Sequence, residues 1–223
     1  MTVWRSWRLL GVSGDSKPTD GPVSRFLNRR IASAIASAII ALNLPLTPNM
    51  LSLISFLTAA AAALFIAGGQ LLVGGLLVQL SSVLDGVDGI VARRLRAASK
   101  AGGFLDTMLD RYADTVIYLA LAYAAVATHG LETWAVLTAV LAVSGDIMVS
   151  YLHTRGERDA GVHPSLVGPL DSLASRDVRL LIVAVITAAG RPLEAMAAVA
   201  LLSHAYVAVK SIYLFSLLKS KGV

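Results

Sequence analysis

The chain contains no cysteine, which excludes disulfide bridges and thiol catalysis. Charged residues are also scarce: they make up 15% of the 223 residues, whereas hydrophobic residues make up 56%. Because soluble domains carry about 25% charged residues, this composition excludes an ordinary soluble protein. It predicts one all-α, polytopic membrane domain. The first apolar stretch follows a polar segment, so we expect no cleavable signal peptide.

Three segments are predicted along the chain. Residues 1–22 form a polar N-terminal segment, which we expect on the cytoplasmic side. Residues 23–46 are predicted to form an amphipathic juxtamembrane helix that lies flat at the interface, because arginines and apolar residues take opposite sides. The two sides consist of Arg25, Arg29 and Arg30, and of Phe26, Ile31, Ile35 and Ile39. Residues 47–223 then form a membrane domain of six transmembrane helices.

The six spans follow from the apolar stretches and their boundaries. Thr47 and Pro48 have the character of an N-cap and a first helical residue, and they open the first span. We expect spans at residues 49–68, 71–94, 102–127, 132–155, 175–189 and 192–218. Their lengths suit about 30 Å of hydrocarbon, except that the fifth is short.

Lysine and arginine positions predict the orientation of these spans. The basic residues lie mainly in the N-terminal segment, between the second and third spans, between the fourth and fifth spans, and in the C-terminal tail. These segments alternate onto one side, which the positive-inside rule makes cytoplasmic. Both termini are therefore expected in the cytoplasm. The net charge of +5 reflects orientation and not a nucleic-acid partner.

Four aspartates lie in otherwise apolar stretches, at Asp85, Asp88, Asp106 and Asp110. A carboxylate in the membrane costs about 2.5 to 3.5 kcal/mol, so these residues need a compensating partner. Their spacing places each pair on one helix face, and hard oxygen ligands suit Mg²⁺, Mn²⁺ or Ca²⁺, whereas zinc favours cysteine and histidine. One or two such ions imply phosphate chemistry. The alternative is that these carboxylates are solvated at helix ends near the membrane interface.

Small residues and one arginine accompany the aspartates. Gly89, Ala92 and Gly102 open a strip where an anionic group can approach the backbone, and Arg93 can pair with a phosphate. Together the residues read D-x2-D-G-x2-A-R-x8-G-x3-D-x3-D. This string resembles the signature of the CDP-alcohol phosphotransferase family at every fixed position.

The resemblance implies an enzyme that transfers a substituted phosphoryl group from a CDP-alcohol to an acceptor alcohol and releases CMP. It implies two Mg²⁺ or Mn²⁺ ions on the four aspartates, with Asp110 also the base that takes the acceptor proton. Gly89, Ala92, Arg93 and Gly102 would bind the CDP group, and Asn49 at the start of the first span would reach a phosphate. A homodimer in the lipid bilayer is a further expectation from the family. The site would lie on the cytoplasmic side.

A basic cluster between the fourth and fifth spans predicts a phosphorylated acceptor. It consists of His153, Arg155, Arg158, Arg176 and Arg179. All of these except Arg158 are expected to bind the acceptor phosphate. The stretch SYLHTRGE resembles SYxKARxE in family members that use inositol phosphate, with His153 in place of lysine and Thr154 in place of alanine. The alternative is that the cluster only anchors the helices on the positive side.

The run KPTDGPVSRFLNRRIAS, from Lys17 to Ser33, resembles the linker of archaeal bifunctional inositol-phosphate enzymes. We therefore expect the chain to be a membrane half on its own, which joins CDP-inositol to inositol 1-phosphate. The alternative is a phospholipid synthase that uses CDP-diacylglycerol or CDP-archaeol. A membrane prenyltransferase and an ion transporter are remoter alternatives, because neither needs the D-G-x2-A-R string.

Overall fold

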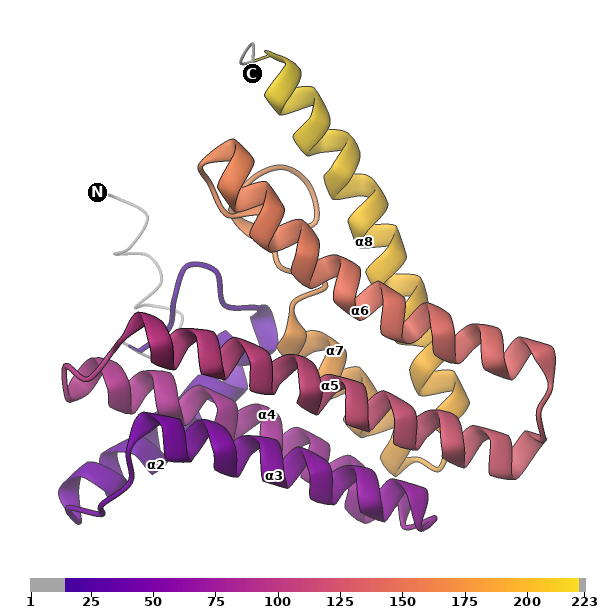
Figure 1. Cartoon of the computed structure of the whole chain (residues 1–223), viewed down its shortest axis with the longest axis horizontal. Helices are drawn as coiled ribbons and strands as arrows, with labels where there is room; N and C mark the ends of the chain where they lie inside the picture. Colours follow the sequence, from indigo (N-terminus) through magenta and orange to yellow (C-terminus); the bar gives the residue numbers. More distant parts are fainter. Residues whose placement is uncertain (1–14, 221–223) are drawn as a thin grey trace.

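The computed structural model describes residues 15–220, and this part of the chain is all-helical, as predicted (Figure 1). Seven α-helices and two short turns of other helix types follow one another. They are η1 (Ser24–Asn28), α2 (Arg29–Ala41), α3 (Pro48–Ala67), α4 (Leu71–Arg94), α5 (Lys100–His129), α6 (Thr133–Ala160), η2 (Pro164–Leu166), α7 (Arg176–Ala188) and α8 (Pro192–Ser220).

Side-chain caps explain where two helices of the site begin. Thr47 Oγ1 accepts a hydrogen bond from the backbone N–H of Met50 at 3.3 Å, and Pro48 is the first residue of α3. The predicted start of this helix is therefore confirmed. Ser99 Oγ accepts from the backbone N–H of Gly102 at 3.0 Å. This cap starts α5 slightly before the expected residue 102 and brings its glycines inside the first turn.

The helices pack in two connected groups. Helices α3, α4 and α5 lie side by side, α6 packs along α8, and α7 joins the groups through its contacts with α4 and α8 (Figure 1). The close approach of α4 and α7 depends on Gly75, because a Cβ there would lie only 2.8 Å from the backbone N of Ala188. The main apolar core between these helices includes Val78, Leu121 and Met196.

Four of the described helices are long and apolar enough to cross a membrane: α3, α4, α6 and α8. The chain is thus an integral membrane protein, and six spans remain a prediction. The early turns of α5 carry several charged residues. Helix α7 has 13 residues, about 20 Å at 1.5 Å per residue, which is less than the hydrocarbon thickness.

The N-terminal part of the described chain packs against the protein. Residues 15–23, which we name the N-terminal strap, precede η1; residues 1–14 of the predicted polar segment lie outside the described residues. In the predicted amphipathic helix, Phe26 and Ile31 are exposed, whereas Arg29 and, from the predicted apolar side, Ile39 are buried. Ala32 and Ala36 belong to an apolar cluster with residues of α4, so α2 is attached to the bundle; its place at the membrane interface stays a prediction.

Candidate active site

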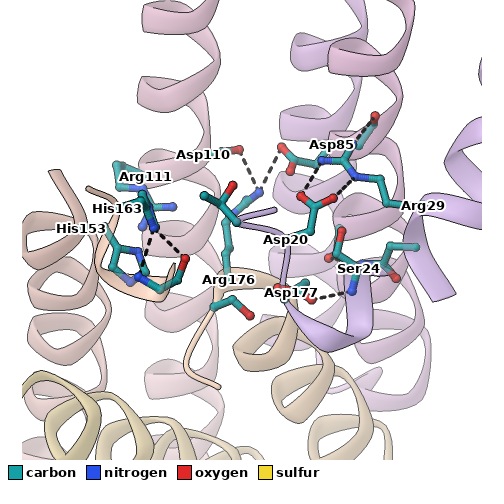
Figure 2. A pocket seen from close by; sticks show the side chains of 17 residues that line it. Asp20, Ser24, Arg29, Asp85, Asp110, Arg111, His153, His163, Arg176 and Asp177 are labelled. Carbon is teal, nitrogen blue, oxygen red and sulfur yellow. Dashed lines mark hydrogen bonds and ion pairs between the residues drawn. The ribbon is translucent and has the colours of Figure 1, made fainter. Parts of the chain in front are cut away.

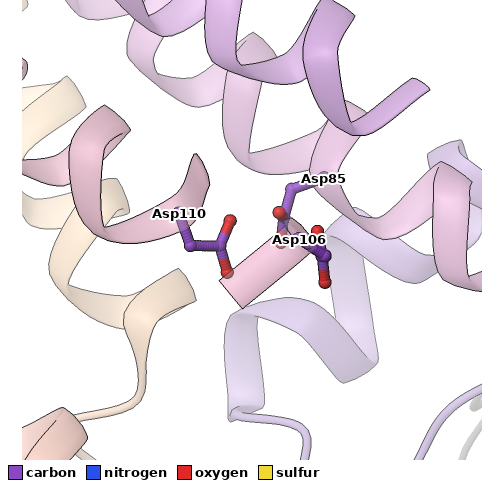
Figure 3. A group of neighbouring side chains, drawn as sticks. All are labelled: Asp85, Asp106 and Asp110. Atoms are coloured by element: carbon purple, nitrogen blue, oxygen red, sulfur yellow. The ribbon is translucent and has the colours of Figure 1, made fainter. Parts of the chain in front are cut away.

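Three of the four predicted metal ligands converge. Asp85 of α4 and Asp106 and Asp110 of α5 each offer a carboxylate oxygen, and these oxygens lie within 4.8 Å of one another (Figure 3). The convergence arises because α4 and α5 are neighbours in the chain and Asp106 and Asp110 are one helical turn apart. Three hard oxygen donors at this separation fit a divalent cation such as Mg²⁺ or Mn²⁺.

Asp88 lies one turn beyond Asp85 and has other partners. Its side chain is 5% exposed, and it accepts hydrogen bonds from Ser52 Oγ of α3 and from the backbone N–H of Gly89. Within the described chain it is not a member of the group of three. Its role as a metal ligand stays a prediction.

Arg176, the first residue of α7, places a positive charge against the aspartates. Its Nη1 lies 3.1 Å from Asp85 and 2.9 Å from Asp110, and its Nε donates to Asp114 at 2.9 Å. Dashed lines in Figure 2 show the first two contacts. A guanidinium that serves three half-buried or buried carboxylates offsets much of their mutual repulsion. Sequence reasoning linked Arg176 to the acceptor alone and missed these ion pairs.

A cavity of about 350 Å³ opens beside this ion-pair cluster (Figure 2). The strap, η1, α2, α4, α5, α6, α7 and the segment between α6 and α7 all contribute to its wall. The lining residues are Thr19, Asp20, Gly21, Ser24, Asn28, Arg29, Ser82, Asp85, Gly86, Asp110, Arg111, His153, His163, Ser165, Ser175, Arg176 and Asp177. A pocket of this size and polarity suits a small, charged and hydroxyl-bearing molecule.

The four residues predicted to bind the acceptor phosphate do not converge. His153 and Arg176 line the cavity. Arg179 is 2% exposed and is held by Asp146 at 2.7 Å in the interior of the bundle. The side chain of Arg155 is 53% exposed and pairs with Asp159 at 2.6 Å along its own helix. The structure thus leaves His153 and Arg176 in contact with the cavity.

Arg111 is a second cation on the cavity wall, and the basic cluster predicted from the sequence did not include it. It bridges Asp114 and Asp146, each at 3.1 Å. Asp146 also holds Arg179, so a buried network of charges connects α5, α6 and α7 behind the site. Such a network tolerates the low dielectric only because each charge has partners.

The residues predicted to bind the CDP group lie near the aspartates on the first turns of α3 and α5 and the last turns of α4. A Cβ added to Gly102 would lie 3.2 Å from Asn49 Oδ1, so these two residues are adjacent across α3 and α5. A Cβ on Gly89 would lie 3.2 Å from Arg93 Nη1. Ala92, which lies between Gly89 and Arg93 in the chain, is half-buried. At Gly102 and Gly89 the lack of a side chain leaves space, whereas a larger residue would crowd Asn49 or Arg93.

The N-terminal strap forms part of the cavity wall, which sequence reasoning did not foresee. Asp20 accepts two hydrogen bonds from Arg29, each 3.0 Å long, and Arg29 Nη1 donates to the carbonyl oxygen of Gly86 at 3.1 Å. Gly21 packs so closely that a Cβ would overlap Ser175 and Asp177 of the α7 start. The strap is therefore tied to both α4 and α7; the run from Lys17 to Ser33 was the available signal.

Comparisons with known proteins agree with this geometry. The model of the CDP-alcohol phosphatidyltransferase family matches residues 45–210. "Bifunctional IPC transferase and DIPP synthase" of Rubrobacter xylanophilus is 40% identical over 186 residues, which are 83% of this chain and 41% of that protein. The chain thus spans about two fifths of that relative. "Archaetidylinositol phosphate synthase" of Pyrococcus horikoshii is 36% identical over 155 residues, 69% of this chain and 72% of that protein.

A solved structure shares the fold. The phosphatidylinositol phosphate synthase of Mycobacterium tuberculosis, solved with CDP-DAG bound, superposes with a TM-score of 0.68 at 22% identity. The superposition covers 83% of this chain and 94% of the other. The same enzyme has been solved in complex with manganese and citrate, with a TM-score of 0.64 at 20% identity over 84% of this chain and 88% of that one.

Proposed function

Because the chain belongs to the CDP-alcohol phosphatidyltransferase family, we propose that it transfers a substituted phosphoryl group from a CDP-alcohol to a hydroxyl group of a second alcohol and releases CMP. The observation that carries this proposal is the convergence of Asp85, Asp106 and Asp110 beside a cavity whose wall also contains Arg176. Carboxylates that hold a divalent cation next to a cationic pocket suit the transfer of a phosphoryl group between two anionic substrates.

The metal ligands in this proposal are Asp85, Asp106 and Asp110, with Asp88 as a fourth. Two Mg²⁺ or Mn²⁺ ions bound there would neutralise the diphosphate and the departing CMP. Arg176 Nη1 contacts both Asp85 of α4 and Asp110 of α5, so it would hold these two carboxylates close together.

In the reaction, the acceptor oxygen attacks the phosphorus that carries the donor alcohol. A new P–O bond forms to the acceptor, and the bond between that phosphorus and the oxygen bridging to CMP breaks. Asp110 faces both the aspartate group and the cavity, so it is placed to take the proton of the acceptor hydroxyl. The electron pair of the broken bond leaves with CMP.

The donor and the acceptor approach from different sides in this proposal. The CDP group lies along Asn49, Gly89, Ala92, Arg93 and Gly102, where the glycines leave room next to polar groups. The acceptor lies in the cavity. Its phosphate faces the cationic wall formed by Arg111 and Arg176, with His153 on α6 beside it.

We propose CDP-inositol as donor and inositol 1-phosphate as acceptor, which would give a phosphorylated di-inositol phosphate. The bifunctional relatives, similar over most of this chain, support this choice. The second candidate is a phospholipid synthase that uses CDP-diacylglycerol or CDP-archaeol with inositol phosphate. The match to an archaetidylinositol phosphate synthase over 72% of that protein favours this candidate. The cationic cavity serves both, because both use a phosphorylated acceptor.

We further propose that α3 to α8 all cross the membrane, that α2 lies at its surface, and that both termini and the site face the cytoplasm. Four apolar helices and the distribution of lysine and arginine support this arrangement. A homodimer is part of the same proposal.

The test is CMP release by the purified protein with Mg²⁺ or Mn²⁺. CDP-inositol, CDP-diacylglycerol and CDP-archaeol are each offered with inositol 1-phosphate. We expect release with CDP-inositol; release with only a lipid donor would select the phospholipid synthase. If all three donors release no CMP while the protein is folded, the proposed activity is wrong.

A further inference from the structure

Two histidines form one side of the cavity, on the other side from Asp20 and Arg29 (Figure 2). His153 belongs to α6 and His163 to the segment that precedes η2. Their ring centroids are 4.6 Å apart and their planes are inclined by 51°. They are ten positions apart in the sequence, and the chain turns at the end of α6 between them.

The partners of His163 determine which of its ring nitrogens carries a proton. The backbone N–H of Ser165 donates to His163 Nδ1 at 3.2 Å, and Ser165 Oγ lies 2.7 Å from the same nitrogen. A nitrogen that accepts a hydrogen bond has no proton, so the neutral ring carries its proton on Nε2. Burial lowers the pKa of His163, which favours this neutral ring. His163 therefore has a second polar group, Nε2–H, which can donate a hydrogen bond to a ligand while Nδ1 contacts Ser165.

The partners of His153 give the complementary result. Its Nε2 lies 3.0 Å from the hydroxyl oxygen of Tyr206, and that hydroxyl donates to the carbonyl oxygen of Asp171 at 3.0 Å. The tyrosine has one proton, which is committed to the carbonyl, so its oxygen accepts from His153 Nε2–H. In a neutral ring Nδ1 then accepts. The two neighbouring rings thus carry one donor, His163 Nε2–H, and one acceptor, His153 Nδ1.

Ser175 adds an observation that is independent of the histidines, and its Oγ packs against Gly21, which lines the same cavity. Ser175 itself lines this cavity, it is 8% exposed, and its Oγ is buried without a hydrogen-bond partner in the described part of the chain. Leaving a buried polar atom unpaired costs about 1 to 3 kcal/mol, and a ligand hydroxyl would supply the missing partner. Lys210 stabilises the same wall, because its Nζ donates to the carbonyl oxygens of Pro164 and Val167.

We infer that His153, His163 and Ser175 recognise the hydroxyl groups of a cyclic polyol, whereas Arg111 and Arg176 bind its phosphate. The inference rests on the proposed function, because it assigns residues of the acceptor cavity to the hydroxyl groups of the proposed acceptor. Each hydroxyl of a vicinal pair both donates and accepts, so one can accept from His163 Nε2–H while its neighbour donates to His153 Nδ1. The wall formed by these three residues thus specifies a polyol phosphate over a phosphate ester without hydroxyls.

The test measures binding without any CDP-alcohol, in the presence of Mg²⁺. Isothermal titration compares inositol 1-phosphate with cyclohexyl phosphate, which has the same six-membered ring and no hydroxyls. We expect the unmodified protein to prefer inositol 1-phosphate. His163→Asn retains an acceptor for the backbone N–H of Ser165, because asparagine is a good N-cap, but it removes Nε2–H. Its Kd for inositol 1-phosphate should rise about three- to ten-fold, with the Kd for cyclohexyl phosphate unchanged.

Two further variants complete the test. Ser175→Ala breaks no hydrogen bond of its hydroxyl, so it should keep the fold and weaken inositol 1-phosphate alone, about three-fold. His129→Asn, at the opposite end of α5, should change neither Kd. Equal affinity of the unmodified protein for both ligands, or equal weakening of both ligands in His163→Asn and Ser175→Ala, would overturn the inference, and so would unchanged binding of inositol 1-phosphate in both variants. The expected binding pattern without CMP release from any donor would contradict the proposed function only.

Discussion

The two sides of the site differ in how far apart their residues lie in the sequence. The aspartate side comes from Asp85 to Asp110, 26 residues on two consecutive helices. The acceptor side joins the strap and η1 to α6 and the start of α7; the hydrogen bond from the backbone N–H of Ser24 in η1 to Asp177 spans 153 residues. Local spacing thus specifies the group of aspartates, whereas long-range packing specifies the cavity that binds the acceptor.

The two sides also differ in charge. The aspartate side brings three carboxylates within 4.8 Å, and two of them form ion pairs with Arg176, which comes from the acceptor side. The acceptor side also contacts the aspartate side through Arg29, which pairs with Asp20 of the strap. Arg29 donates to the carbonyl oxygen of Gly86, one residue after Asp85. A change on one side can therefore reach the other through these contacts.

The largest expected effect is on the aspartate side. In Asp106→Asn, one charged metal ligand is lost, and we expect turnover to fall on the order of a hundred- to a thousand-fold while the protein stays folded. CMP release and Mn²⁺ binding by electron paramagnetic resonance measure the two consequences. Asp159→Asn, which changes an exposed aspartate paired with Arg155, is the matched control. Near-normal turnover in Asp106→Asn would contradict the two-helix metal site.

The next effect separates two arginines of α7. Arg176→Ala should raise the acceptor KM about ten- to a hundred-fold and lower kcat, because Arg176 contacts both the aspartates and the cavity. Arg179→Ala should leave the acceptor KM nearly unchanged and destabilise the protein by about 3 kcal/mol, because it removes a buried partner of Asp146. Steady-state kinetics and thermal unfolding in detergent distinguish them. Loss of acceptor affinity in Arg179→Ala without loss of stability would reverse the assignment.

A smaller effect tests the strap. In Gly21→Ala the added Cβ would overlap Ser175 and Asp177, so the strap must move, at a cost of about 1 to 3 kcal/mol. We expect a lower Tm and a higher acceptor KM, with the KM of the CDP-alcohol unchanged. Gly103→Ala, where a Cβ meets nothing within 4 Å, should not lower the Tm. An unchanged acceptor KM in Gly21→Ala would remove the strap from the acceptor side.

The smallest effect concerns Arg155. Its ion pair with Asp159 is exposed, and such pairs contribute about 0.2 to 1 kcal/mol. Arg155→Ala should therefore change the Tm little and the acceptor KM less than about two-fold. A selective rise of the acceptor KM, measured beside Arg176→Ala, would restore Arg155 to the acceptor side.

The sequence predicted more of the aspartate side than of the acceptor side. The second expected span, 71–94, has the bounds of α4, and Thr47 caps α3 as expected. Asp85, Asp106 and Asp110 converge because a helical repeat and a short connection are local properties. Of the four residues predicted to bind the acceptor phosphate, by contrast, two line the cavity. The motif SYLHTRGE identified His153, but nothing in its spacing identified His163.

The sequence alone determined that this chain is helical and apolar and that its aspartates meet across two consecutive helices. It could do so because hydrophobic composition and helical periodicity act over a few turns. Tertiary structure decided which cations face the cavity. Arg176 and Arg179 are one turn apart on α7, yet one meets the aspartates and the other Asp146. It also decided that Asp20 and Gly21 pack beside α7. Such contacts depend on how helices that are distant in the sequence pack together, and a local sequence pattern carries no information about that packing.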